Sequence, residues 1–209
     1  SSSVYGGNTR LPFNETQGVD HPVSLYATTK RANELMAHTY SHLYGLPTIG
    51  LRFFTVYGPW GRPDMALFLF TKAMLRGEQI EVFNNGEMSR DFTFIDDIVE
   101  SMERLINKPA TSDSLFDKMN PDPSKSWAPF RIFNIGNSNP ASLMDYIKAI
   151  EKATNKKAIK KYLPMQLGDV PKTAATTDAL EKWVDFKPNT SIEDGIGKFV
   201  KWYRDYYQI

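Results

Sequence analysis

Short apolar segments alternate with longer segments of helical periodicity along most of this 209-residue chain. Residues 48–54 and 92–95 have the β-branched and aromatic content of strands, whereas residues 24–44 and 191–207 repeat apolar side chains at helical spacing. A strand that is followed by a helix and then by another strand is typical of a parallel sheet with helices packed on it. The pattern therefore predicts an α/β fold with a mostly parallel sheet.

Capping residues and chain breakers place the other expected elements. Ser24 and Ser142 stand where helix N-caps belong, and Asp96 and Asp97 stand where a cap and a first-turn acid belong. Asn-Asn-Gly at residues 84–86 is a turn signal. We also expect helices at residues 65–76, 97–106 and 177–183, strands at 80–83 and 131–136, the end of a strand at 4–6, and a surface loop at 107–129.

Charge and cysteine content exclude several classes of protein. With 25 basic and 24 acidic residues the net charge is +1, so we expect neither nucleic acid nor an anionic membrane as a partner. The chain contains no cysteine, which excludes disulfides, thiol nucleophiles and cysteine-ligated metals and fits a cytoplasmic location. The longest apolar runs are far too short to cross a bilayer.

Tyr26 and Lys30 form the candidate catalytic pair. They lie four residues apart on an expected helix, so both side chains occupy one face, about one turn from each other. A free tyrosine has a pKa near ~10 and is a poor base at neutral pH, but a neighbouring ammonium favours the phenolate. Because such a pair arises often by chance, the surrounding motifs decide what it means.

Several motifs occur in an order and spacing that resemble the extended short-chain dehydrogenase/reductase family, and in particular its NAD-dependent epimerases and dehydratases that act on sugar nucleotides. They cover nearly the whole chain, and motifs linked in register are far more specific than any one alone. They are SSSVYG at residues 1–6, SLYATTK at 24–30, LRFFTVYGP at 51–59, SRDFTFIDD at 89–97, FNIG at 133–136 and LPMQLGDV at 163–170.

The resemblance implies a hydride-transfer site that uses NAD as its cofactor. By this comparison Tyr26 removes the proton of a sugar C4 hydroxyl, Ser1 hydrogen-bonds the same oxygen, and Lys30 also contacts the nicotinamide ribose. Phe54 and Val56 are implied to lie beside the nicotinamide. A 4-keto sugar then turns over and takes the hydride back on its other face, so the reaction is an epimerisation without net redox change.

The resemblance is closest to UDP-glucuronate 4-epimerases. Related dehydratases carry an acid directly after the serine, whereas this chain has Ser2 and Ser3, which disfavours elimination. Arg62 resembles the arginine that glucuronate epimerases turn towards the sugar carboxylate, with Ser2, Ser3 and Thr55 assisting, because a guanidinium fork suits a carboxylate. The alternative is a loop arginine paired with Asp64, which we consider the weaker interpretation.

The resemblance also implies contacts with the rest of the UDP-sugar substrate. Arg90 matches the position that contacts the diphosphate, Phe83 a position beside the uracil, and Asp169 the acceptor for ribose hydroxyls. Gln166 departs from the arginine that some UDP-galactose-type epimerases carry there, which leaves its role less defined.

Two other clusters have a simpler interpretation. Glu34, His38 and His42 share a helix face at a spacing that could begin a metal site, but no further ligand is evident, so we expect a plain helix surface and no metal. The aromatic residues at 202–207 could stack bases, but their helical spacing favours packing of the terminal helix.

The resemblance predicts an incomplete Rossmann-type parallel sheet together with a smaller α/β substrate-binding domain. Residues 1–62 correspond to the C-terminal part of the NAD-binding domain with the catalytic helix, and residues 63–209 mainly to the UDP-sugar domain, with segments that return to the Rossmann sheet. No glycine-rich phosphate turn is present, so we expect more than about a hundred residues of the parent to be absent. Alone, such a chain should be inactive and self-associate.

Three functions remain open from the sequence. The first is NAD-dependent conversion of UDP-glucuronate to UDP-galacturonate. The second is 4-epimerisation of another UDP-hexose or UDP-N-acetylhexosamine. The third is a non-catalytic module that binds a sugar nucleotide. For the enzyme, the family implies a homodimer that meets through the helix at residues 24–44.

Overall fold

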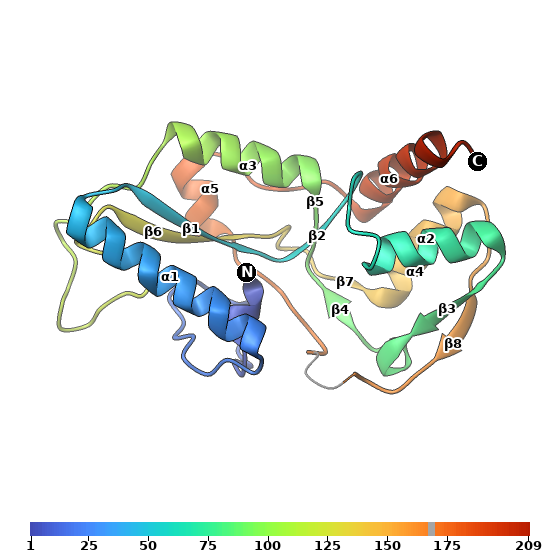
Figure 1. Cartoon of the computed structure of the whole chain (residues 1–209), viewed down its shortest axis with the longest axis horizontal. Coiled ribbons are helices and arrows are strands. Elements are labelled where there is room, and N and C mark those ends of the chain that lie inside the picture. The colour runs from blue at the N-terminus through green and yellow to red at the C-terminus, as the bar shows by residue number, and fades with distance from the viewer. Residues whose placement is uncertain (167–169) are drawn as a thin grey trace.

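The computed structural model describes residues 1–166 and 170–209, which form two lobes with the N-terminus between them (Figure 1). Their elements are the following, in chain order: η1 (Ser2–Tyr5), α1 (Leu25–Tyr44), β1 (Thr48–Phe53), β2 (Thr55–Tyr57), α2 (Ala66–Arg76), β3 (Gln79–Val82), η2 (Phe83–Gly86), β4 (Ser89–Arg90), β5 (Phe92–Phe94), α3 (Ile95–Asn107), β6 (Phe130–Ile135), β7 (Ala141–Ser142), α4 (Leu143–Thr154), β8 (Ile159–Tyr162), α5 (Asp178–Val184) and α6 (Ile192–Tyr207).

The first lobe is built on the parallel pair β1 and β6, in which Thr48 lies opposite Phe130 and Phe53 opposite Ile135. α1 lies on one side of this pair, and α3 and α5 lie on the other (Figure 1). The core under α3 and α5 is aliphatic and aromatic, and its buried residues are Ile98, Leu105, Phe133, Ile135, Leu180 and Val184. This lobe positions α1, the helix that carries Tyr26 and Lys30.

The second lobe packs α2, α4 and α6 around the parallel pairs β2–β5 and β3–β8 (Figure 1). Its core is rich in aromatic rings, and Phe92 stacks on Tyr146 with ring centroids 3.9 Å apart. β4 and β7 form a short antiparallel pair. The predicted α/β fold with mainly parallel strand pairing is therefore confirmed.

The serine caps explain where three helices begin. The Oγ atoms of Ser24, Ser142 and Ser191 accept hydrogen bonds from backbone N–H groups three residues later, at 3.0–3.1 Å. α1 ends where Gly45 adopts a left-handed conformation with φ +64. The capping predictions for Ser24 and Ser142 are confirmed, and Ser191 is a further cap.

Two local predictions are wrong. Residues 4–6 belong to no strand, because η1 is a 3-10 turn in which Gly6, at φ +46, donates its N–H to Ser3 O. Asp96 does not cap α3, since the N-cap residue is Phe94, and Asp96 and Asp97 both lie in the first turn. The turn predicted at residues 84–86 is confirmed: Asn84 and Asn85 have φ values of 49 and 51 inside η2.

Candidate active site

The candidate catalytic pair lies on the first two turns of α1. The Ser24 cap fixes the start of the helix, and Tyr26 and Lys30 then fall on one face. The Lys30 ammonium lies 5.2 Å from the centroid of the Tyr26 ring, and the Tyr26 side chain is 58% exposed. The phenol and the ammonium are thus neighbours, and solvent or a ligand can reach the ring.

Ser1 shares one hollow with this pair. The hollow has a volume of about 440 Å³, and its lining includes Ser1, Tyr26, Lys30, Glu34 and Phe54. The backbone nitrogen of Ser1 donates to Leu51 O at 3.1 Å, which attaches this residue to β1. The structure therefore brings together the three residues predicted to be catalytic, and one of the two predicted to lie beside the nicotinamide.

A second hollow adjoins the first at Ser1. Its lining includes Ser2, Ser3, Thr55 and Arg90, all predicted to contact the substrate. The Oγ atoms of Ser1 and Ser3 lie 2.9 Å apart, so this edge is lined by hydroxyl groups. The Arg90 guanidinium donates to Ser89 O and Pro171 O, both at 3.1 Å, and these bonds orient its charge.

A third hollow continues from Thr55 to Arg62 and also contains Val56. The loop begins at Gly58, where φ is +146 and an added Cβ would lie 2.5 Å from Ile95 Cγ2, so only glycine fits. Trp60 then packs against α6, with ring centroids 5.3 Å from Trp202 and 5.2 Å from Tyr206. The predicted packing role of the aromatic residues at 202–207 is confirmed.

Arg62 is paired with Asp64, the arrangement that the sequence made the weaker interpretation. Its Nε donates to Asp64 Oδ1 at 3.1 Å and its Nη2 to Oδ2 at 2.5 Å. Arg62 is 74% exposed, and the hydrogen bond from Arg62 lowers the pKa of the Asp64 carboxyl.

The remaining predicted substrate contacts lie apart from these hollows. Phe83 opens η2 beside β8, where Asn85 N donates to Leu163 O at 3.1 Å. Gln166 is exposed at the end of the segment that follows β8. Neither residue lines the three hollows. Asp169 lies outside the described residues.

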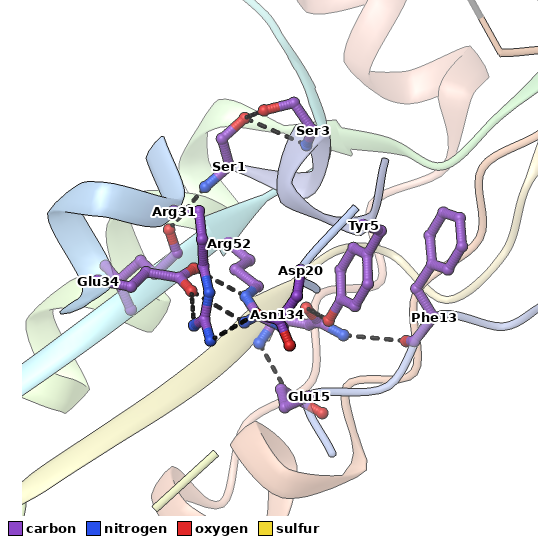
Figure 2. A network of polar contacts seen from close by, with 11 residues as sticks. Ser1, Ser3, Tyr5, Phe13, Glu15, Asp20, Arg31, Glu34, Arg52 and Asn134 are labelled. Carbon is purple, nitrogen blue, oxygen red and sulfur yellow. Dashed lines mark hydrogen bonds and ion pairs between the residues drawn. The ribbon is translucent and has the colours of Figure 1, made fainter. Parts of the chain in front are cut away.

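A buried polar network lies beneath the first hollow and was not predicted (Figure 2). Arg52 donates from Nε to Glu34 Oε1 at 2.8 Å and from Nη2 to Oε2 at 3.0 Å. Burial alone would raise the pKa of the Glu34 carboxyl, but the hydrogen bonds and charges of Arg52 and Arg31 outweigh burial and lower it. A charged residue in the apolar segment LRFF was the available sequence signal, because a buried charge requires a partner.

Asp91 is a second buried carboxylate that the sequence did not single out. It accepts hydrogen bonds from the backbone N–H groups of Asn137, Ser138 and Ala175 at 2.6–3.1 Å, and so joins the loop after β6 to the segment before α5. Burial raises the pKa of this carboxyl despite the three donors. Asp91 follows Arg90 directly, so these three hydrogen bonds also fix the backbone next to that arginine.

The Glu34, His38 and His42 face is occupied by protein contacts. His38 Nε2 lies 2.8 Å from Ser126 Oγ, and Trp127 Nε1 donates to His42 Nδ1 at 3.1 Å. In the part of the chain that the structure describes, no group of three or more histidine or acidic side chains is arranged to hold a metal ion. The helices of residues 1–166 and 170–209 are also too short or too polar to span a membrane.

Residues 1–136, more than half of the chain, match the NAD dependent epimerase/dehydratase family. This segment contains Ser1, Tyr26, Lys30 and Arg62. The chain belongs to this family. The resemblance inferred from the motifs is therefore confirmed, and so is the Rossmann-type α/β fold, which the family's solved structures share.

Individual relatives within the epimerase family are close. The chain is 58% identical to Protein CapI of Staphylococcus aureus over 208 residues, covering 100% of this chain and 62% of the relative. It is 49% identical over 209 residues to a probable UDP-glucuronate 4-epimerase of Rhizobium meliloti (strain 1021), covering 100% of this chain and 61% of the relative.

Solved structures of the epimerase family are also similar to this chain. The UDP-glucuronic acid 4-epimerase of Bacillus cereus in complex with UDP-glucuronic acid and NAD superposes with a TM-score of 0.83 at 30% identity. The match covers 99% of this chain and 60% of that structure. The chain thus spans about three fifths of the length of these relatives.

Proposed function

We propose that the intact protein carrying this chain converts UDP-glucuronate to UDP-galacturonate by NAD-dependent 4-epimerisation. The observation that carries the proposal is that Ser1, Tyr26 and Lys30 line one hollow. The second hollow adjoins it at Ser1, and the third adjoins the second at Thr55 and reaches Arg62. The names of the Rhizobium and Bacillus relatives support the same reaction.

The first hollow fits a bound dinucleotide by the chemistry of its donors. Within the described residues the Lys30 ammonium has no carboxylate partner, so it is available to ribose hydroxyls. Phe54 offers an apolar wall for a nicotinamide ring, and Val56 follows two residues later on β2. When bound, NAD⁺ accepts the C4 hydride of the sugar and later returns it.

Residues of this chain carry out the proton transfer. Tyr26 takes the proton from the C4 hydroxyl as the C4–H bond breaks, with Lys30 stabilising the phenolate and Ser1 Oγ hydrogen-bonded to the C4 oxygen. The sugar is then a ketone at C4. After the sugar rotates, the hydride returns to the opposite face and Tyr26 gives back the proton, so atoms and electrons balance without an external reductant.

Basic residues along the other two hollows suit an anionic sugar nucleotide. In this proposal Arg62 receives the sugar carboxylate through its planar fork, with the hydroxyls of Ser2, Ser3 and Thr55 nearby. Arg90 faces the diphosphate. Phe83 and Gln166 would contact the nucleoside from the second lobe, and Asp169 would accept from ribose hydroxyls.

The pairing of Arg62 with Asp64 favours a second candidate, epimerisation of a neutral UDP-hexose or UDP-N-acetylhexosamine. In that case Asp64 would neutralise the arginine permanently, and no sugar carboxylate would be needed. A third possibility, a non-catalytic module that binds a sugar nucleotide, is consistent with the partial coverage of the relatives.

The test uses the intact protein with UDP-glucuronate, UDP-glucose or UDP-N-acetylglucosamine, and follows the C4 proton signals of substrate and product by NMR. We expect turnover of UDP-glucuronate that falls by about 100-fold or more in Tyr26→Phe.

Arg62→Ala should weaken turnover of UDP-glucuronate without affecting turnover of neutral sugars. Equal turnover of neutral and acidic sugars in wild type would favour the second candidate, and nucleotide binding without turnover the third.

We also propose a cytoplasmic homodimer that meets through α1. The helix exposes a row of large apolar side chains to solvent, namely Leu35, Met36, Tyr40, Leu43 and Tyr44. The division of the sequence into two domains is placed near residue 62, a few residues after the chain enters the core of the second lobe at Tyr57. Sedimentation equilibrium of the intact protein tests the dimer, which a Leu43→Glu variant should weaken and which a strictly monomeric wild type would exclude.

A further inference from the structure

Arg52 is a fully buried cation next to the last residue of β1, with no exposed side-chain surface. Both of its bonds to Glu34 are short and roughly parallel, the fork arrangement that fixes orientation as well as distance (Figure 2). The strand is therefore attached to α1 at one defined point.

That point lies directly below the candidate catalytic pair. Glu34 follows Lys30 by four residues and Tyr26 by eight, so all three side chains lie along one face of α1. Arg31 holds the other side of the same carboxylate, from Nη1 to Oε2 at 3.1 Å. The rotation of α1 about its own axis is thus set by what Glu34 binds.

Arg52 also contacts the turn that carries the serines. Its guanidinium carbon lies 4.9 Å from the centroid of the Tyr5 ring, and Tyr5 is the last residue of η1. The ring stacks on Phe13 at 4.6 Å, and its hydroxyl donates to Asn134 Oδ1 at 2.7 Å. One guanidinium therefore contacts both the element that carries Tyr26 and Lys30 and the element that follows Ser1.

Stability alone does not explain this arrangement. Removing two charges from water costs several kcal/mol per ion by general experience, and well-packed apolar residues often serve as well or better. Arg52 Nη1 has no hydrogen-bond partner within the described residues, which adds to the cost. An arginine at this position is better explained by the geometry that it imposes.

We propose that Arg52 and Glu34 are positioning residues that hold the Tyr26 and Lys30 face of α1 at a fixed distance and rotation from Ser1. The inference rests on the proposed epimerisation for its kinetic consequence, but its structural consequence, a fixed start of α1, is independent of the substrate. Neither side chain is given a role in bond making.

The kinetic test compares Arg52→Lys and Glu34→Gln with wild type in the intact protein. Lysine keeps the charge and loses the fork, and glutamine keeps the shape and loses the charge. We expect kcat to fall by about 100-fold, because a displacement near 1 Å costs that much, while KM for UDP-glucuronate changes by less than about 3-fold. Arg104→Lys, which alters an exposed arginine–glutamate pair on α3, should leave both constants unchanged.

A double variant separates positioning from stability. Arg52→Met with Glu34→Leu replaces the ion pair by apolar side chains of similar size and leaves Arg31 its pair with Asp20, so the protein should stay folded. We expect kcat to remain low although the protein is folded. Recovery of wild-type kcat in this variant, or a loss of kcat that only follows the unfolded fraction, would overturn the proposal.

Hydrogen exchange gives a readout that does not depend on any substrate. In Arg52→Lys the amides of the first half of α1 should exchange about 10-fold faster, whereas those of α6 and of the Arg104→Lys control should not change. If wild type fails to turn over UDP-glucuronate, the proposed function fails, and this measurement still decides the positioning role. Unchanged exchange in α1 overturns that role.

Discussion

Single side chains decide what charge the candidate site presents. Arg62 is held by Asp64 with the same fork geometry that a sugar carboxylate would use, and both partners are largely exposed. Exposed ion pairs contribute only about 0–1 kcal/mol, so a substrate carboxylate can displace Asp64 at little cost. Asp64 is therefore expected to weaken the binding of acidic substrates slightly and to leave the binding of neutral substrates unchanged.

The substitution Asp64→Asn tests this competition in the intact protein. We expect KM for UDP-glucuronate to fall by about 2- to 5-fold with kcat unchanged, because the arginine no longer has an internal carboxylate partner. KM for UDP-glucose should not move. Asp145→Asn, which removes a similarly exposed ion pair on α4, serves as the control. A higher KM for UDP-glucuronate would mean that Asp64 holds Arg62 in place and does not compete for it.

At the scale of elements, α6 packs so closely on β2 and β5 that its glycines have different roles. A Cβ at Gly195 would lie 2.3 Å from the Tyr57 hydroxyl and 2.8 Å from Phe94 Cδ2, whereas a Cβ at Gly197 would meet nothing within 4 Å. Both residues lie in the same helix. Gly195 therefore permits the contact, and Gly197 only lowers the helix propensity.

We expect Gly195→Ala to lower the free energy of unfolding by about 1–3 kcal/mol through overpacking. Gly197→Ala, its matched control, should raise the free energy of unfolding by roughly 0.5–1 kcal/mol, since alanine is the better helix former. Urea unfolding followed by circular dichroism measures both. Destabilisation of similar size by both substitutions would show that the close approach of α6 to Tyr57 is absent in solution.

The elements could be predicted from sequence where their cause is local. Ser24 and Ser142 cap helices through backbone groups three residues away, and both caps were predicted. The turn η1 could not be predicted, because Tyr5 is held by Phe13 and by Asn134, which is 129 residues away. The contact between Arg52 and Glu34 could not be predicted for the same reason, because it joins a strand to the helix that precedes it.

The candidate site shows the same division. The order of the motifs predicted that Ser1, Tyr26 and Lys30 would act together, and they share a hollow. Arg62 lies against Asp64, the arrangement given as the weaker of two stated interpretations, and its contact with a sugar carboxylate stays a prediction. An arginine two residues from an aspartate can face either the aspartate or a ligand. No feature of the sequence distinguishes these two orientations of the side chain.

For the whole molecule, resistance to acid depends on a few carboxylates with many partners. Glu151 on α4 accepts from Ala158 N, Lys160 Nζ and Lys157 Nζ, each at 3.0 Å. Burial alone would raise the pKa of this carboxyl, but the backbone donor and the two ammonium groups outweigh burial and lower it from 4.5 to about 2. Because the folded pKa is depressed, the stabilisation is complete above about pH 4.5 and is lost as the pH falls towards 2.

Glu151→Gln should lower the free energy of unfolding at pH 7 by about 2 kcal/mol, a value reduced for the exposure of Lys157. The difference from wild type should shrink by roughly half at pH 3, because wild type then begins to lose the same contribution. Urea unfolding at pH 7, 5 and 3 measures it. A difference that stays constant across these values would mean that the carboxylate charge does not contribute.

β1 and β2 are one run of backbone interrupted only at Phe54, yet their partners β6 and β5 belong to different lobes. The peptide units around Phe54 are therefore one of the places where the chain passes from one lobe to the other. Phe54 lines the first hollow and Thr55 the second and third. A substitution that displaces the backbone at this crossing would therefore alter the walls of all three hollows at once.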